Sequence, residues 1–320
     1  MITMTEIARM TRVSQATVSR VLNGSALVSP EVKERVLACA RAHNYQFNAL
    51  AKGLQGSRTH LLGVILSDIS NSFFADLERE IEARAREHDY SIILFNTDLN
   101  PVRQLECLDV ARRYRVDGVL FVPTMDNAQL WAEFVGKLDI PAVAITARVQ
   151  GFDSFYLDHE QASRQAARHL AGQGYDRFLF VGPPTDVKYL GFARELESMS
   201  LRAGHIPYED DDQFLRSLET CLDRPGPRTG IFANNDMYGV RVLRALWDMG
   251  VRVPEDAGVI GFDDTSIGRY SRPSLSTISQ PLAQMAGEAV TRLFHRIDHP
   301  HEAELLDRPF PAALVSREST

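Results

Sequence analysis

The pattern of apolar positions changes near residue 60 of the chain. Before this point, apolar side chains recur at intervals of three and four residues, as they do on one face of a short helix. After it, short runs rich in Val, Ile, Leu and Phe alternate with amphipathic stretches. Alternating strand and helix signals predict parallel sheets covered by helices on both faces. We therefore expect a small all-α head followed by a larger α/β region.

The head is predicted to contain three short helices. Thr3 and Glu6 have the spacing of a capping box, which begins the first helix. Ser14 can cap a second helix that runs to about Asn23. Pro30 suits the first turn of a third helix, where its missing N–H is not needed. Three short helices with a tight turn before the second are typical of a helix-turn-helix.

The second helix has one apolar face, and its other face carries groups that can read DNA. In a major groove, Arg20 can pair with guanine, Gln15 with adenine, and the Ala16 methyl group can contact a thymine methyl group. Other polar groups suit phosphates, which fix the register of a protein on DNA without reading its sequence; they are Thr3, Ser14, Ser19 and Asn23. The alternative is a small helical cap with no role in DNA binding.

Charge is distributed unevenly along the chain. The first 60 residues hold eight Lys and Arg against three Glu, a net charge of +5, whereas the whole chain has a formal net charge of −7. The remaining residues therefore have a net charge of −12. A basic head on an acidic body indicates that only the head binds a polyanion such as DNA.

The head also resembles a known family. The stretch IARMTRVSQATVSRVLNGSALVSPEVKERVLACARAHNYQFNALAKGL resembles the DNA-binding head of the lactose/galactose repressor (LacI/GalR) family, most specifically in VSQATVSRVLNG. The resemblance implies a helix-turn-helix over residues 1–46, and over 47–60 a hinge helix and linker that orders on operator DNA. Leu54 would then enter the minor groove, with Lys52 near the DNA backbone. The alternative for 47–60 is a plain linker.

Two positions depart from the family pattern. Arg12 stands in the turn before the second helix, where the family usually has Gly, so we expect Arg12 to adopt an unusual backbone conformation or the turn to differ. Phe47 stands where the family usually has Pro, just before the hinge. Neither departure removes a residue expected to read a base.

Apolar runs in the α/β region predict two series of strands. The first series lies at 61–66, 91–95, 118–122 and 141–145, and the second at 154–157, 177–181, 229–233 and 257–261. Through the blocks SDISNSFF, DHEQASRQAARHL, ANNDMYGV, VPEDAGVIGFDDT and STISQP it resembles a sensor domain of the periplasmic-binding-protein type. The fold class expected is thus two doubly wound parallel-sheet lobes that follow the all-α head and hinge. The N-terminal lobe is predicted at 61–150 plus about 281–308, and the C-terminal lobe at 151–280 plus the tail.

Ligands of such sheets bind beyond the carboxyl ends of the strands. The strand-end positions and the resemblance together give these expected effector contacts: Asp68, Phe73, Phe74, Thr124, Arg148, Asp158, Lys188, Asn235, Asp263 and Gln280. Carboxylates and amides can hydrogen-bond sugar hydroxyls, and aromatic rings offer flat faces. Alternatively, the Asp residues cap helices and the Phe residues belong to the core. Lys188 stands where the family has an effector-binding Arg, and a lysine offers a point charge in place of a planar group that binds in a bidentate way. Lys188 and Arg148 together could instead hold a phosphate. The stretch ARVQGF…GPPTDV also resembles repressors that respond to a phosphorylated trehalose.

Other chemistries have no support in the sequence. There is no G-x-S-x-G, Walker or H-E-x-x-H motif, so we expect no enzyme, no metal site and no cofactor. No apolar run reaches the ~18 residues that cross a membrane, and the first ten residues lack the apolar segment of a secretory signal. Three widely spaced cysteines, at positions 39, 107 and 221, favour a cytoplasmic protein without disulfides.

The sequence therefore predicts a transcriptional regulator, most simply a repressor, that binds a pseudo-palindromic operator as a homodimer. A small carbohydrate or sugar phosphate between the lobes would control it. Two alternatives stay open: a catabolite-type regulator whose co-effector is a phosphoprotein, and a sugar-binding protein with no DNA role.

Overall fold

The computed structural model describes residues 2–22, 27–43, 45, 58–124, 128–208, 211–222 and 226–320. The chain divides into two compact units, Met1–Thr59 and His60–Thr320. Most of the predicted hinge lies outside the described residues, as do the expected DNA contacts Asn23, Lys52 and Leu54.

The first unit holds the three expected helices, α1 (Met4–Thr11), α2 (Gln15–Leu22) and α3 (Pro30–Ala42). The capping box is present, because the Thr3 backbone N–H donates to a Glu6 carboxylate oxygen at 2.7 Å and the Glu6 N–H donates to the Thr3 hydroxyl at 3.3 Å. Arg12 ends α1 in the left-handed region, with φ of 55°. Arg12 therefore adopts an unusual backbone conformation, which is one of the two outcomes expected where the family usually has Gly.

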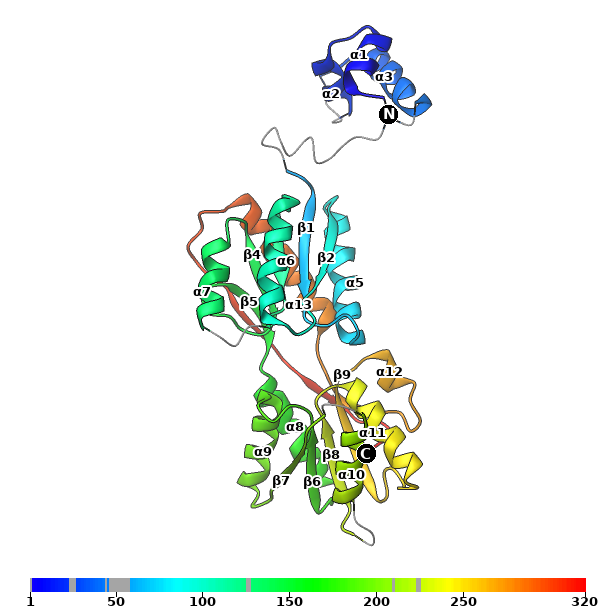
Figure 1. Ribbon diagram of the computed structural model, residues 1–320, viewed down its shortest axis with the longest axis vertical. Helices are drawn as coiled ribbons and strands as arrows, with labels where there is room; N and C mark the ends of the chain where they lie inside the picture. The colour runs from blue at the N-terminus through cyan, green and yellow to red at the C-terminus, as the bar shows by residue number, and fades with distance from the viewer. Residues whose placement is uncertain are drawn as a thin grey trace. The chain divides into compact units, whose positions relative to one another are not determined.

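The first lobe of the second unit is built on a parallel sheet, which has six strands in the described part of the chain, in the order β11-β5-β4-β3-β1-β2 (Figure 1). Its strands are β1 (Leu61–Leu66), β2 (Ser91–Asn96), β3 (Gly118–Phe121), β4 (Ala142–Thr146), β5 (Asp153–Leu157) and β11 (Asp307–Phe310). Helices α5 (Ser72–Glu87) and α13 (Leu282–Asp298) pack on one face, and α6 (Pro101–Arg113) and α7 (Ala128–Lys137) pack on the other.

The second lobe repeats this plan (Figure 1). Its strand order is β12-β10-β9-β8-β6-β7, and β12 runs antiparallel to β10. The strands are β6 (Arg177–Val181), β7 (Ala203–Ile206), β8 (Thr229–Ala233), β9 (Ala257–Asp263), β10 (Ser276–Ser279) and β12 (Ala313–Val315). Helices α8 (His159–Gly172) and α9 (Val187–Ser198) cover one face, and α10 (Asp211–Cys221) and α11 (Asp236–Asp248) cover the other. The short helix α12 (Ser266–Arg269) follows β9.

One expected strand belongs to the other lobe. The segment predicted at 154–157 to open the second series is β5, which pairs with β4 and β11 in the first sheet. Asp153 explains this position, since its buried carboxylate accepts from Arg296 of α13 at 2.5 Å and from the Leu306 N–H at 2.7 Å. The first lobe therefore runs to the end of β5 and not to residue 150.

The chain crosses between the lobes after β5, after β10 and after β11 (Figure 1). The segment of about 281–308 returns to the first lobe as expected, since α13 packs there against α5 and the middle strands. Among the described helices, none combines the length and the apolar character that crossing a membrane requires.

Candidate functional site

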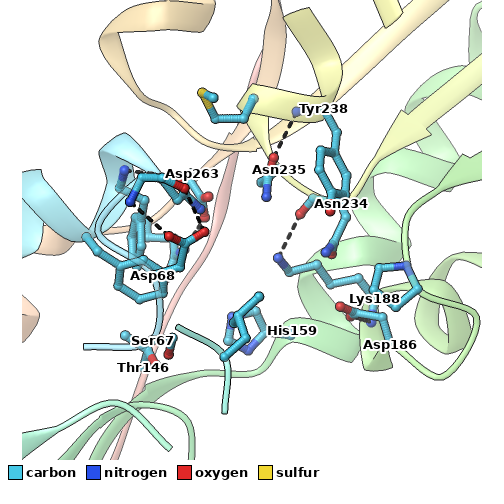
Figure 2. Close-up of a pocket in the computed structure, with 18 of the residues that line it drawn as sticks. Ser67, Asp68, Thr146, His159, Asp186, Lys188, Asn234, Asn235, Tyr238 and Asp263 are labelled. Atoms are coloured by element: carbon cyan, nitrogen blue, oxygen red, sulfur yellow. Dashed lines mark hydrogen bonds between the residues drawn. The ribbon is translucent and has the colours of Figure 1, made fainter. Parts of the chain in front are cut away.

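A cleft of about 440 Å³ lies between the lobes, where the carboxyl ends of strands from both sheets meet (Figure 2). The first lobe contributes Ser67, Asp68, Ser70, Asn71, Phe73, Phe74, Leu99 and Thr146. The second lobe and the crossover after β10 contribute His159, Pro183, Asp186, Lys188, Asn234, Asn235, Met237, Tyr238, Arg241, Asp263 and Gln280. Seven of the ten expected effector contacts are thus gathered in one place.

Asp263 links the two lobes across this cleft. It is the last residue of β9 and has a φ of 107°, which turns its carboxylate toward the cavity. The Gln280 side-chain amide donates to Oδ1 of Asp263 at 2.7 Å, and the side chain of Asn71 in the first lobe also hydrogen-bonds it. Burial raises the pKa of Asp263 to about 7, although nearby Lys188 and the two amides oppose the shift.

Asp236 holds the end of β9 in place through hydrogen bonds. Its carboxylate accepts hydrogen bonds from the Thr265 N–H at 2.6 Å and from the hydroxyl groups of Thr265 at 2.9 Å and Thr277 at 2.6 Å. Burial raises the pKa of Asp236 to about 6. Gly261 on β9 leaves room for this carboxylate, because a Cβ there would lie 2.3 Å from Oδ1 of Asp236. Asp236 thus fixes the turn that presents Asp263.

Lys188 is held against the wall of the second lobe. It lies in the first turn of α9, which Asp186 caps by accepting the Lys188 N–H at 2.8 Å. Its ammonium group donates to the Asn234 carbonyl at 2.8 Å, as Figure 2 shows, and lies 4.1 Å from the centre of the Phe262 ring. A lysine in this position makes one point-charge contact with the backbone and a cation–π contact.

His159 was not predicted from the sequence, although it follows the expected contact Asp158 directly. It begins α8 and stacks on Phe262, with 5.5 Å between ring centres. Desolvation in the cleft, reinforced by the charge of Lys188, lowers the pKa of His159 to about 3. The imidazole is therefore neutral at physiological pH, and its ring nitrogens remain hydrogen-bonding groups.

Aromatic side chains form the flat parts of the wall. Phe73 is 4% exposed and packs edge-on against Phe74, with 5.1 Å between ring centres. On the opposite lobe Tyr238 stacks on Tyr208 at 4.4 Å. Arg241 donates to the Tyr208 hydroxyl at 2.7 Å and lies over the same ring. The cleft therefore combines polar side chains with flat apolar faces.

In the first unit, α2 presents an exposed polar face. Gln15, Ala16 and Arg20 are exposed, whereas Val18 and Val21 are buried against the other helices. In the turn before α2, the hydroxyl of Ser14 accepts the Thr17 N–H at 3.1 Å. Ser19 is partly buried, and the Thr3 side chain takes part in the capping box. The side chains proposed to read bases thus lie together on the outer side of one helix.

Comparison with known proteins agrees with a DNA-binding head and a two-lobed ligand-binding region. The model of the bacterial regulatory proteins of the lacI family matches residues 3–48, and a periplasmic binding protein-like domain matches residues 167–320. Catabolite control protein A of Priestia megaterium is 31% identical over 332 residues, which cover 100% of this chain and 99% of that protein. This chain belongs to the LacI family. It is a DNA-binding transcriptional regulator, as its sequence predicts.

Other LacI-family proteins extend the comparison. The ribose operon repressor of Halalkalibacterium halodurans is 31% identical over 333 residues, covering 100% of this chain and 97% of that protein. A LacI family regulator of Enterococcus faecium with bound ribose has a TM-score of 0.71 at 26% identity, over 81% of this chain and 98% of the other. The Lac repressor dimer bound to operator and an anti-inducer has a TM-score of 0.84 at 23% identity, over 99% and 98%.

Three expected effector contacts of this LacI-family chain lie outside the cleft lining. Thr124 donates through its N–H and hydroxyl groups to Gln104, at 3.1 and 2.7 Å. Arg148 is exposed and pairs with Asp307 at 2.6 Å, so it does not join Lys188 to hold a phosphate. Asp158 caps α8 by accepting the Gln161 N–H at 2.9 Å. Each of the three side chains therefore has a hydrogen-bond or ion-pair partner outside the cleft lining.

Proposed function

We propose that this chain represses transcription by binding a pseudo-palindromic operator as a homodimer, and that a small carbohydrate in the interlobe cleft sets its affinity for the operator. The observation that carries this proposal is the cleft itself, in which both lobes direct side chains toward one group, the Asp263 carboxylate. Concave sites with a few convergent polar groups and aromatic walls bind small polar ligands. The ribose bound to the Enterococcus faecium relative supports a sugar.

The DNA side of the proposal rests on α2. Arg20, Gln15 and Ala16 would read base edges in the major groove, while Ser14 and Thr3 would contact phosphates. A homodimer would present two such helices to two half-sites related by a two-fold axis. In the segment that follows, Leu54 would enter the minor groove between the half-sites, and Lys52 would lie near the DNA backbone there.

Coupling between cleft and operator requires only that the sugar binds one arrangement of the lobes better than another. A sugar that bridges Asn71 of the first lobe and Asp263 of the second would hold the lobes closed. Closure would change the contacts between the protomers of a dimer and thereby the order of the hinge segments.

The test measures operator affinity with and without sugars. Binding-site selection with the full chain yields an operator, and fluorescence anisotropy then gives its Kd in the presence of neutral and phosphorylated sugars. We expect one sugar to change this Kd at least tenfold. Failure to select any DNA sequence would contradict the operator part of this proposal. A response only to a phosphoprotein purified from lysate would support the catabolite-type alternative.

A further inference from the structure

We propose that the effector of this chain is an uncharged sugar and that the cleft rejects the phosphate ester of the same sugar. This inference rests on the proposed function and specifies its ligand. It follows from two features of the lining. Some buried hydrogen-bond acceptors have no donor, and the basic side chains already have partners within the chain.

The cleft presents acceptors that need donors. In the part of the chain that the structure describes, two buried side-chain oxygens that line the cleft, Oε1 of Gln280 and Oδ1 of Asn234, have no hydrogen-bond partner. Leaving a buried acceptor unsatisfied is costly. Sugar hydroxyls can donate to these oxygens, whereas a phosphate dianion can only accept.

Carboxylates add to this demand for donors. Three of them, Asp68, Asp186 and Asp263, are found among the described residues that line the cleft. Each carboxylate has about four acceptor sites, and the contacts within the chain use only some of these sites. A phosphate placed here would face the negative charges of Asp68 and Asp186, whereas burial leaves Asp263 partly protonated near neutral pH.

Each basic side chain of the lining already has a partner within the chain. Lys188 donates to the Asn234 carbonyl and lies over Phe262, and Arg241 binds the Tyr208 hydroxyl at the exposed rim. His159 does not add a cation, because burial and Lys188 lower its pKa to about 3. Arg148, the second cation that a phosphate would need, pairs with Asp307 elsewhere.

Helix N-termini are the other common phosphate sites, since their free N–H groups point at the ligand. Here the helices that begin at the cleft are capped by their own side chains. Asn71 accepts the Phe73 N–H at the start of α5, and Asn235 accepts the Tyr238 N–H at the start of α11. Asp186 caps α9 and thereby places a negative charge where a phosphate would bind.

The first experiment compares matched ligands on the full chain. Neutral mono- and disaccharides are screened by thermal shift. Isothermal titration at pH 7.5 then measures each binder beside its phosphate ester, with ribose and ribose 5-phosphate, glucose and glucose 6-phosphate, and trehalose and trehalose 6-phosphate as the core pairs. We expect the neutral sugar to bind at least 100-fold more tightly than its ester.

An ester that binds as tightly as the neutral sugar overturns the inference and leaves the proposed regulator intact. Binding of neither form overturns both the sugar effector and the inference.

The second experiment changes the charge without removing the helix cap. Asp186→Asn keeps a side chain that caps α9 well and removes one negative charge from the cleft. We expect the ratio of ester affinity to neutral-sugar affinity to rise at least tenfold. Asp248→Asn is the control, because Asp248 is exposed on α11, pairs with Arg244 and does not line the cleft. An equal ratio in the wild-type chain and both variants would show that cleft charge does not select the ligand.

Discussion

Burial shifts the pKa values of three residues in or next to the cleft. Asp263 and Asp236 hold protons to a higher pH than an exposed carboxyl group does, and His159 loses its proton far below the usual pH of an imidazole. Burial disfavours the charged form of each group, which moves the pKa of an acid up and that of a base down. The cleft therefore carries less charge at neutral pH than its sequence alone indicates.

His159 should make the protein sensitive to mild acid. Its pKa is about 3 in the folded chain and about 6.5 when exposed, so between these values the unfolded state binds more protons. The contribution of His159 to the free energy of unfolding should therefore fall as the pH falls below 6.5, by about 2 kcal/mol at pH 5. The raised pKa values of Asp263 and Asp236 act in the opposite direction, so the comparison with a variant is needed to isolate His159. Urea unfolding of wild-type protein and His159→Gln at pH 7.5 and 5.0 measures this. The variant should lose less stability on acidification, and equal losses would contradict the argument.

The site residues show where sequence reasoning works and where it stops. Positions directly after a strand, such as Asp68 and Asp263, could be predicted because the end of a parallel strand always faces the same edge of the sheet. His159 and Tyr238 lie in the first turns of helices, where no pattern separates a side chain that points into the cleft from one that does not. Arg148 was misplaced because its partner, Asp307, is distant in the sequence.

At the scale of elements, strands marked by long apolar runs were predictable, and strands without such runs were not. The runs at 61–66, 177–181 and 229–233 match β1, β6 and β8 in their bounds, since buried parallel strands read as continuous apolar runs. Strands β7, β10, β11 and β12 were missed. They are only three or four residues long, and β11 contains Asp307, Arg308 and Pro309. Their pairing depends on neighbours contributed by distant parts of the chain.

The link between β5 and α13 should be essential for the stability of the first lobe. Asp153 is 1% exposed, and its partner Arg296 is also buried. Removing one member of a buried ion pair leaves an unpaired charge and costs about 3–5 kcal/mol. Urea unfolding of Asp153→Ala should show a loss of this size.

The matched control is Asp248→Ala, which breaks an exposed ion pair with Arg244 on α11. Exposed pairs contribute about 0–1 kcal/mol. If the two variants were equally stable, β5 would not depend on its buried carboxylate.

On the scale of the whole molecule, reading DNA and sensing a ligand belong to separate compact units. Their functions should therefore be separable by mutation. Arg20→Ala should weaken operator binding by about 1–3 kcal/mol, relax base preference at one position in each half-site, and leave sugar binding unchanged. Asp263→Ala should abolish the response to sugar and keep the operator affinity of the ligand-free protein.

Fluorescence anisotropy with a set of operators, each changed at one base pair, measures both effects. Uniform weakening by Arg20→Ala across all these operators would mean that Arg20 contacts only phosphate. A normal sugar response in Asp263→Ala would remove Asp263 from the effector site.

The three crossings between the lobes also bear on synthesis of the protein. Strand β5 borders β4 early in the chain, but its other neighbour, β11, lies about 150 residues later. While a ribosome makes the intervening segment, one side of β5 stays an open edge, which is a place where other nascent chains can pair. The two lobes can reach their final form only together, when the last part of the chain leaves the exit tunnel.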